Sequence, residues 1–283
     1  MKLTHIGIVG RPHTPELKPN LERLLQLCRS LGVHAELEAS LSDAPGAPER
    51  AELLSRVQAL VVLGGDGSLL ANARAAAAAK VPLIGINQGR LGFLTDLSLS
   101  DFEHKLPAVL GGAYHRETRP LIETSGAVRA LAFNDMVVTR LSGNLIDLHI
   151  RFDQKPAFNL RADGLIIATP TGSTAYALSA GGPIIHPGVA ALALVPVAPF
   201  ALTMRPIVLP SSTHITLSLG KGQKAHLNAD GQEQFELHDD EEVHLSLSQQ
   251  EVSLLHPLDH NYTAVLRSKL AWSETAESLR SAA

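Results

Sequence analysis

A glycine-rich turn between an apolar run and an alanine-rich stretch constrains the fold of this chain more than any other feature. Residues 59–63 read Ala-Leu-Val-Val-Leu, a short apolar run typical of a strand that is buried on both faces of a parallel sheet. The turn Gly-Gly-Asp-Gly follows at residues 64–67, and the alanine-rich residues 73–79 predict a helix with Ser68 as its N-cap. A strand, a turn and a helix in this order predict an α/β unit whose turn lies at the carboxyl edge of the sheet.

The same turn has the features of an anion site that contains an acid. Unpaired N–H groups and the positive end of the helix dipole attract anions, so Gly64, Gly65 and Ser68 are predicted to hold phosphate oxygens. The turn matches neither the P-loop nor the dinucleotide fingerprint, because it places Asp66 inside the phosphate cradle. An acid beside phosphates is repelled unless it binds a metal ion or accepts a proton from an attacking hydroxyl. The alternative, which the turn alone leaves open, is a tight corner with Asp66 as a solvated capping residue.

The first hundred residues alternate between strand and helix patterns. Apolar runs predict strands at residues 3–9, 33–37, 59–63 and 82–87, with helical patterns between them. This order predicts a doubly wound, Rossmann-like α/β domain over residues 1–100, with ligands outside the carboxyl ends of its strands.

The rest of the chain has a different pattern. Short β-rich runs separated by turn residues predict a second, mainly β domain over residues 101–256, built as a sandwich or layered sheet. Residues 262–270 read as a helix, and we expect residues 257–283 to pack back on the first domain. The whole chain is therefore predicted to be α+β with two domains.

Composition excludes several classes of partner. The chain has 283 residues and a net charge of −4, so bulk attraction to nucleic acid or to an anionic membrane has no support, and we expect neither as a partner. The single cysteine cannot form an internal disulfide, which favours a cytoplasmic setting. The thirteen histidines are scattered, and no group of His or Asp has the spacing of a dedicated metal site, so metal ligands stay unassigned.

A second constellation, residues 162–183, is dense in turn formers and hydroxyls around one predicted strand. Ser173 or Thr174 is expected to cap a short helix that follows the strand. Backbone N–H groups, small side chains and hydroxyls suit a nucleotide better than a metal ion. The alternative is a strand-turn-helix corner whose hydroxyls only satisfy caps.

The pair Asn134-Asp135 stands at the start of another predicted strand. An amide that donates and a carboxylate that accepts can together bind the two vicinal hydroxyls of a ribose. An ordinary turn is the alternative for any single pair of this kind.

Taken together, these motifs resemble those of the bacterial NAD kinases, in the same order and over nearly the whole chain. The resemblance rests on residues 64–67, 87–94, 134–135, 163–183 and 269–273. The block at 163–183 is far more specific than the Gly-Gly-Asp-Gly turn, which also occurs in phosphofructokinases and in lipid kinases of the diacylglycerol kinase type. Two departures are visible: Asp135 stands where many relatives have Glu, and Ala271 replaces a more usual glycine.

The resemblance implies that ATP phosphorylates the 2′-hydroxyl of the adenosine ribose of NAD, with Mg²⁺ or another divalent cation arriving with ATP. It also implies a homodimer or homotetramer, and leaves open whether polyphosphate can replace ATP. Asp66 resembles the catalytic base of the family. The NAD-binding set that the resemblance implies is Asp66, Gly67, Asn134, Asp135, Arg161, Asp163, Thr174, Ala175, Tyr176, Ala177, Leu178, Ser179 and Gln232.

Two other functions remain as alternatives. A lipid or sphingoid-base kinase shares the acidic turn and a two-domain plan, but the block at 163–183 is more polar than an acyl pocket requires. A non-catalytic NAD(P) sensor would gain nothing from an acid among phosphates, so Asp66 argues against it.

Overall fold

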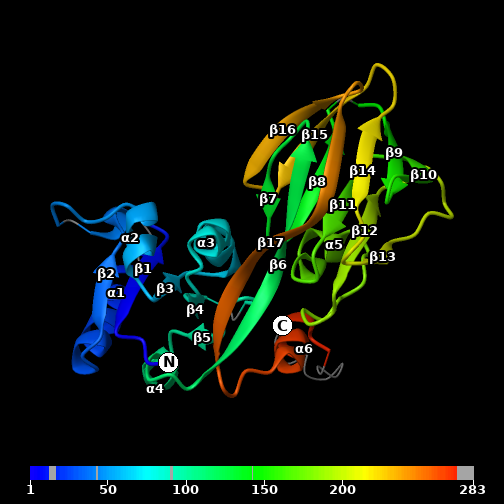
Figure 1. Ribbon diagram of the computed structural model, residues 1–283. Helices are drawn as coiled ribbons and strands as arrows, with labels where there is room; N and C mark the ends of the chain where they lie inside the picture. The colour runs from blue at the N-terminus through cyan, green and yellow to red at the C-terminus, as the bar shows by residue number, and fades with distance from the viewer. Residues whose placement is uncertain (13–16, 43, 90–91, 142, 273–283) are drawn as a thin grey trace. The chain divides into compact units, whose positions relative to one another are not determined.

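A computed structural model describes residues 1–12, 17–42, 44–89, 92–141 and 143–272 (Figure 1). The chain divides into two compact units. The first contains residues 1–118 and the chain from residue 253 onward, and the second contains residues 119–252. No helix among the described residues is long and apolar enough to cross a membrane.

The first unit is built on a parallel sheet, as its apolar runs predict (Figure 1). The strand order is β17-β4-β3-β1-β2, all of these pairs are parallel, and β5 pairs with β4. The strands are β1 (His5–Gly10), β2 (His34–Leu37), β3 (Ala59–Leu63), β4 (Leu83–Asn87), β5 (Leu97–Ser98) and the last residues of β17 (Glu242–Pro257). Every residue of β3 and β4 is buried, which is expected of central strands covered on both faces.

Helices cover both faces of this sheet. Apolar residues of α1 (Leu17–Ser30) and α4 (Phe102–Leu110) share one buried cluster with alternate residues of β1, β3 and β4. On the opposite face, α2 (Arg50–Arg56) brings Leu53 against Gly7, and α3 (Asp66–Ala79) brings Leu69 against Gly85. The unit is completed by α6 (Tyr262–Leu270) and a short 3₁₀ helix, η1 (Ala39–Leu41).

Cys28 is buried in the α1 cluster, and burial raises the pKa of its thiol to about 11. The residue is therefore an inert packing group rather than a nucleophile.

The second unit consists of two antiparallel sheets, which confirms the predicted layered β architecture. One sheet has the order β13-β12-β11-β8-β15-β16, and the other joins β10, β9, β14 and β17, with β6 beside β17 and β7 beside β6. A single apolar cluster draws residues from both sheets, so their inner faces form one core. The bounds are β6 (Tyr114–Gly126), β7 (Leu131–Ala132), β8 (Asp135–Arg140), β9 (Ile146–Phe152), β10 (Lys155–Ala162), β11 (Gly164–Ala168), β12 (Ala191–Val197), β13 (Ile207–Pro210), β14 (Ile215–Leu219), β15 (Lys224–Ala229) and β16 (Glu233–His238), with η2 (Gly172–Thr174) and α5 (Tyr176–Ser179) after β11.

The structure corrects two expected helix caps. Helix α3 begins at Asp66 with Gly65 as its N-cap, so Ser68 lies in the first turn and is not the cap. After β11, neither Ser173 nor Thr174 caps α5, whose N-cap is Ala175. These hydroxyls instead donate to the carbonyl oxygens of Pro170 and Thr171, three residues earlier.

Candidate active site

A cavity of about 480 Å³ opens at the carboxyl edge of the parallel sheet in the first unit. Strand β1 has β2 on one side and β3 on the other, so the topological switch point of the sheet lies between β1 and β3. The cavity is lined by the turn after β1 and by the turn after β3 with the start of α3, which is where doubly wound folds bind ligands. Its lining residues are Gly10, Arg11, Pro12, Arg50, Gly65, Gly67, Ser68, Ala71 and Asn72.

The cavity wall combines helix amides with two cationic side chains. The N-cap of α3 is Gly65, which has no side chain to accept hydrogen bonds from the N–H groups of the first turn. Arg11 and Arg50 add positive charge, and the Arg50 guanidinium is held by the buried Glu38 at 2.7 Å. Among the described residues no acid lines the cavity. This composition suits a polyanion such as a chain of phosphates.

Asp66 is held by backbone amides of a distant segment. Its Oδ2 accepts from the amide of Phe93 at 2.8 Å, and its Oδ1 accepts from the amide of Leu94 at 3.0 Å. The Thr95 hydroxyl lies 3.4 Å from Oδ1, and Asn87 at the end of β4 donates to that hydroxyl at 2.8 Å. The carboxylate at the head of α3 is therefore fixed in one orientation rather than solvated like an ordinary cap.

Two glycines allow the close approaches around Asp66. A Cβ on Gly92 would lie 1.8 Å from Oδ1 of Asp66, and one on Gly64 would lie 2.3 Å from the Ser68 hydroxyl. Real Cβ atoms do not approach neighbours so closely, so a side chain at either position must displace what it meets. Glycine is therefore required at positions 64 and 92, because neither position has room for a side chain.

In the second unit, a carboxylate from another turn holds Asn134 and Asp135. Asp230 accepts from the amides of Phe133 at 2.8 Å, Asn134 at 2.7 Å and Asp135 at 3.2 Å. Burial, and then the charge of Asp230, raise the pKa of the Asp135 carboxyl to about 7. At neutral pH this carboxyl is present in both protonation states, so it can accept or donate a hydrogen bond.

The turn after β11 packs directly on the same segment. The Thr169 amide and hydroxyl donate to carbonyl oxygens of residues 133 and 134, and a Cβ on Gly172 would lie 2.0 Å from the carbonyl oxygen of Asn134. Ser173 is used internally, since it also accepts from the amide of Ile185 at 3.0 Å. The buried Thr171 hydroxyl has no protein partner among the described residues, so it is the one hydroxyl of this turn left to a ligand or water.

The predicted residues of α5 differ in exposure. Tyr176 is 45% exposed and Ser179 is also exposed, whereas the Ala177 side chain is buried in an apolar cluster against the sheet. Gln232 is exposed in the turn that carries Asp230. Since Asp230 bonds the Asn134 segment, this turn and α5 belong to the same end of the six-stranded sheet.

Arg161 and Asp163 lie apart from this group. Asp163 precedes β11 and pairs with Arg140 at 2.7 Å, whereas Asn134 and the Thr169 turn lie at the other end of β11 and β8. A five-residue strand spans about 17 Å. Arg161 is exposed, lies 3.9 Å from Asp147 and stacks over Phe200. The second unit thus holds the predicted residues in two separate groups.

Several functional candidates were missing from the sequence interpretation. Asp230 and the amides of Phe93 and Leu94 bond the predicted residues through contacts distant in sequence, and Arg11 and Arg50 line the same cavity as Gly65, Gly67 and Ser68. A weak signal exists for Asp230, because an Asp-Gly turn precedes Gln232. Nothing in the local sequence indicates the amide contacts to Asp66.

Asp135→Asn is expected to stabilise the protein at pH 8. The folded pKa of about 7 exceeds the unfolded value of about 4, so ionisation of the wild-type carboxyl costs folding free energy that is fully present above pH 7. An amide avoids this cost, of the order of a few kcal/mol. Chemical unfolding from pH 8 to pH 4 should show the advantage of the variant shrinking as pH falls. The exposed Asp240→Asn is the matched control, and an advantage independent of pH contradicts the prediction.

Comparison with known proteins identifies the family. Two family models match, the ATP-NAD kinase N-terminal domain at residues 46–114 and the ATP-NAD kinase C-terminal domain at residues 133–257. A NAD kinase from Burkholderia thailandensis is 41% identical over 290 aligned positions, covering 97% of each chain. The chain belongs to the NAD kinase family. It is accordingly a phosphotransferase, as the acidic phosphate turn predicts, and neither the lipid kinase nor the sensor is favoured.

Solved structures agree with this fold. An NAD kinase from Archaeoglobus fulgidus in complex with ATP superposes with a TM-score of 0.77 and 29% identity, covering 94% of this chain and 98% of that one. A yeast NADH kinase complexed with NADH gives a TM-score of 0.84 over 97% of this chain and 89% of that one, and at 23% identity it shows the fold alone. The NAD kinase fold confirms the predicted α/β N-terminal and mainly β C-terminal domains.

Proposed function

We propose that this chain transfers the γ-phosphoryl group of ATP to the 2′-hydroxyl of the adenosine ribose of NAD, giving NADP, with Asp66 as general base. The observation that carries the proposal is the Asp66 carboxylate, which two amides hold at the head of α3, beside the cavity with cationic walls. Its oxygens keep lone pairs that can accept the proton of an attacking hydroxyl. The named substrates of relatives, NAD and ATP, support the choice of reaction.

The cavity supplies the groups that phosphoryl transfer requires. Gly65 and Gly67 offer backbone amides, Ser68 offers its hydroxyl, and Arg11 and Arg50 offer charge to phosphate oxygens. The amides of Gly64 and Ser68, which were also expected to bind phosphate, instead donate to the carbonyl oxygens of Ile86 and Gly65. In-line transfer depends mainly on positioning and on stabilising the charge that spreads over the transferred group. Asp66 takes the proton from the 2′-hydroxyl as that oxygen attacks the γ-phosphorus, and the bond from this phosphorus to the β–γ bridging oxygen breaks, so that ADP leaves.

A divalent cation, expected to be Mg²⁺, is best placed with the phosphates of ATP. Among the described residues the cavity wall carries arginines and no acid, a donor set that fits phosphate oxygens and not a metal ion held by protein alone. Asp66 is the nearby carboxylate that can share such an ion. When bound, the cation would neutralise part of the negative charge on the phosphate oxygens.

NAD is proposed to bind the group of residues around Asp230 in the second unit. Asn134 and Asp135 are assigned to the ribose hydroxyls, and the buried Thr171 hydroxyl supports a polar ligand at this turn. The further proposed contacts are Gly67, Gln232 and the helix residues Thr174, Ala175, Tyr176, Ala177, Leu178 and Ser179. Arg161 and Asp163, at the other end of β11, are proposed to contact a part of the dinucleotide that is remote from this ribose. A cytoplasmic homodimer or homotetramer is proposed as the working form.

The decisive experiment is a product assay with the purified protein. ATP and Mg²⁺ are supplied with NAD or with diacylglycerol, and NADP is measured with an NADP-specific dehydrogenase. NADP formation is the expected result, and a parallel reaction with polyphosphate defines the donor range. Phosphorylated lipid without NADP, or NAD binding without ADP release, overturns the proposal.

Gly92→Ala is expected to lower turnover by about 10²-fold, the scale of a misplacement of about 1 Å at a reacting group. The new Cβ would lie 1.8 Å from Asp66 Oδ1, so the carboxylate or the segment that holds it must move. Gly89→Ala is the matched control, because its Cβ would meet its nearest neighbour at 3.8 Å, an ordinary contact. Steady-state kinetics of both variants check the prediction, and equal turnover in the two contradicts it.

A further inference from the structure

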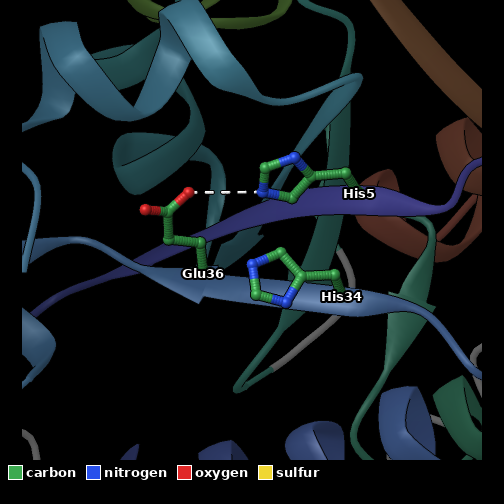
Figure 2. A group of neighbouring side chains, drawn as sticks. All are labelled: His5, His34 and Glu36. Carbon is green, nitrogen blue, oxygen red and sulfur yellow. Dashed lines mark hydrogen bonds and ion pairs between the residues drawn. The ribbon is translucent and has the colours of Figure 1, made fainter.

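Two histidines and a glutamate lie together on the parallel sheet of the first unit, away from the cavity. His5 begins β1 and His34 begins β2, and the two residues are direct partners in the parallel register. Glu36 lies two residues after His34 and so projects from the same face of its strand. Figure 2 shows the two imidazole rings side by side, with the Glu36 carboxylate reaching toward His5. Sequence spacing could not reveal this group, because strand pairing brings it together.

The ligand atoms of the three side chains have the spacing of a metal site. His5 Nε2 lies 3.2 Å from Glu36 Oε2, the two rings have centroids 4.6 Å apart, and all three ligand atoms fall within 4.8 Å of one another. A tetrahedral ion with bonds of about 2.0–2.1 Å holds its ligands about 3.3 Å apart. One pair already has this separation, and rotation of the exposed His34 ring can bring the third ligand in.

A neighbouring arginine orients the carboxylate. Arg56 Nη1 lies 3.0 Å from Oε1 of Glu36, the oxygen that does not face His5. Oε2 is thereby directed toward the histidines, which is the role that outer partners play around metal ligands. The side chains of His5 and Glu36 are 29% and 19% exposed, so an ion can enter and water can complete its coordination.

The donor set selects the class of ion. Two imidazoles and one carboxylate, with a position left for water, form an open zinc-type site. Mg²⁺ and Ca²⁺ prefer oxygen ligands only, so the imidazoles discriminate against the cation that accompanies ATP. Metal ligands must be deprotonated to bind, so the affinity of such a site is expected to weaken as pH falls.

The other histidine group of this unit does not have these properties. Both ring nitrogens of His256 face carboxylates, Nδ1 toward Asp96 and Nε2 toward Glu117 at 2.9 Å, and its side chain is only 1% exposed. His260 bonds the second oxygen of Asp96 at 2.8 Å. This group is a satisfied buried network, whereas the group on β1 and β2 is open to solvent.

We propose that His5, His34 and Glu36 form a binding site for one Zn²⁺-type divalent transition-metal ion that links the edge strand β2 to β1. Such an ion would stabilise the edge of the sheet, since among the described strands β2 pairs with β1 alone. The site is separate from the proposed catalytic cavity, and its test does not depend on activity.

The test uses the untagged full-length protein and Zn²⁺ alone as the probe, in isothermal titration calorimetry. Wild type is expected to bind one Zn²⁺ at this site and to unfold at a higher temperature in its presence. His34→Gln should weaken binding by at least ~10-fold, because loss of a ligand costs no less than loss of an outer partner. Co²⁺ in place of Zn²⁺ should give the visible absorption of a tetrahedral site in wild type and not in the variant.

Two controls locate the ion. His104→Gln changes an exposed histidine elsewhere on this unit and should leave binding unchanged. His260→Gln changes the buried group and should also leave it unchanged. Loss of binding in His260→Gln with retention in His34→Gln overturns the proposal, as does the absence of saturable Zn²⁺ binding by wild type.

Discussion

Asp66→Asn is expected to lower kcat by at least ~10²-fold while NAD still binds, because an amide cannot take the proton of the attacking 2′-hydroxyl. The substitution preserves size, and its amide oxygen can still accept from one of the two N–H groups, of Phe93 and Leu94, that hold the wild-type carboxylate. Steady-state NADP formation measures the turnover, and calorimetric titration with NAD measures the binding. The two measurements together separate loss of chemistry from loss of the site.

A matched control removes a carboxylate with a structural role in the same unit. Asp101 Oδ1 accepts from the amide and the hydroxyl of Ser98, both at 2.7 Å, and lies outside the cavity lining. Asp101→Asn is expected to retain near-normal turnover with at most a modest loss of thermal stability. Near-normal turnover in Asp66→Asn would remove Asp66 from the role of general base.

Much of the fold follows from local sequence patterns. The strands β1 to β4 were predicted because central strands of a parallel sheet are continuous apolar runs, and Ala59–Leu63 is buried at every position. In contrast, the length of β17 (Glu242–Pro257) does not follow from an apolar run, because exposed polar residues at 249–251 interrupt its apolar positions.

The helix caps predicted at Ser68 and at Ser173 or Thr174 were wrong for a specific reason. Ser and Thr hydroxyls can bond an amide ahead or a carbonyl behind, and local sequence does not decide between them. At Ser173 and Thr174 the hydroxyls bond carbonyls three residues earlier. At Ser68 the helix had already begun, because Gly65 is able to serve as N-cap and Asp66 is held from outside the helix.

The residue types of the candidate site can be named from the sequence, but their geometry cannot. Asp66, the glycines beside it and the pair Asn134-Asp135 are visible in the sequence because they are the residue types that the proposed chemistry requires. Their orientation depends on partners that are distant in the chain, such as Asp230, which lies 96 positions from Asn134. Burial beside Asp230 also gives Asp135 its raised pKa, a property that no motif carries.

A chain of contacts links Asp66 to the buried histidine. The amides of Phe93 and Leu94 hold Asp66, and two residues further on Asp96 bonds His256 and His260. His256 in turn bonds Glu117, which lies in the part of β6 that belongs to the first unit. The segment that orients the proposed base is therefore anchored by an ion-pair network inside its own unit.

His256→Ala is expected to destabilise the protein by about 3–5 kcal/mol, because it removes a buried side chain that two partly buried carboxylates, Asp96 and Glu117, share as a partner. Burial disfavours the charged form of His256, but Asp96 and Glu117 outweigh it and raise its pKa. Burial likewise opposes ionisation of Asp96, while the hydrogen bonds from His256 and His260 lower its pKa well below the usual range. His104→Ala, at an exposed histidine, is the control and should change stability little.

The pH dependence tests the cause of this loss. A histidine with a raised folded pKa contributes stability fully below its unfolded pKa of about 6.5 and loses it as pH rises through the folded value. A carboxyl with a lowered folded pKa contributes above about 4 and loses its contribution as pH falls. The difference in unfolding free energy between wild type and His256→Ala should therefore be largest between about pH 4 and 6.5 and narrow on both sides. A difference that stays constant from pH 4 to pH 9 would assign the loss to the cavity left by the ring, and not to the charges that anchor the Asp66 segment.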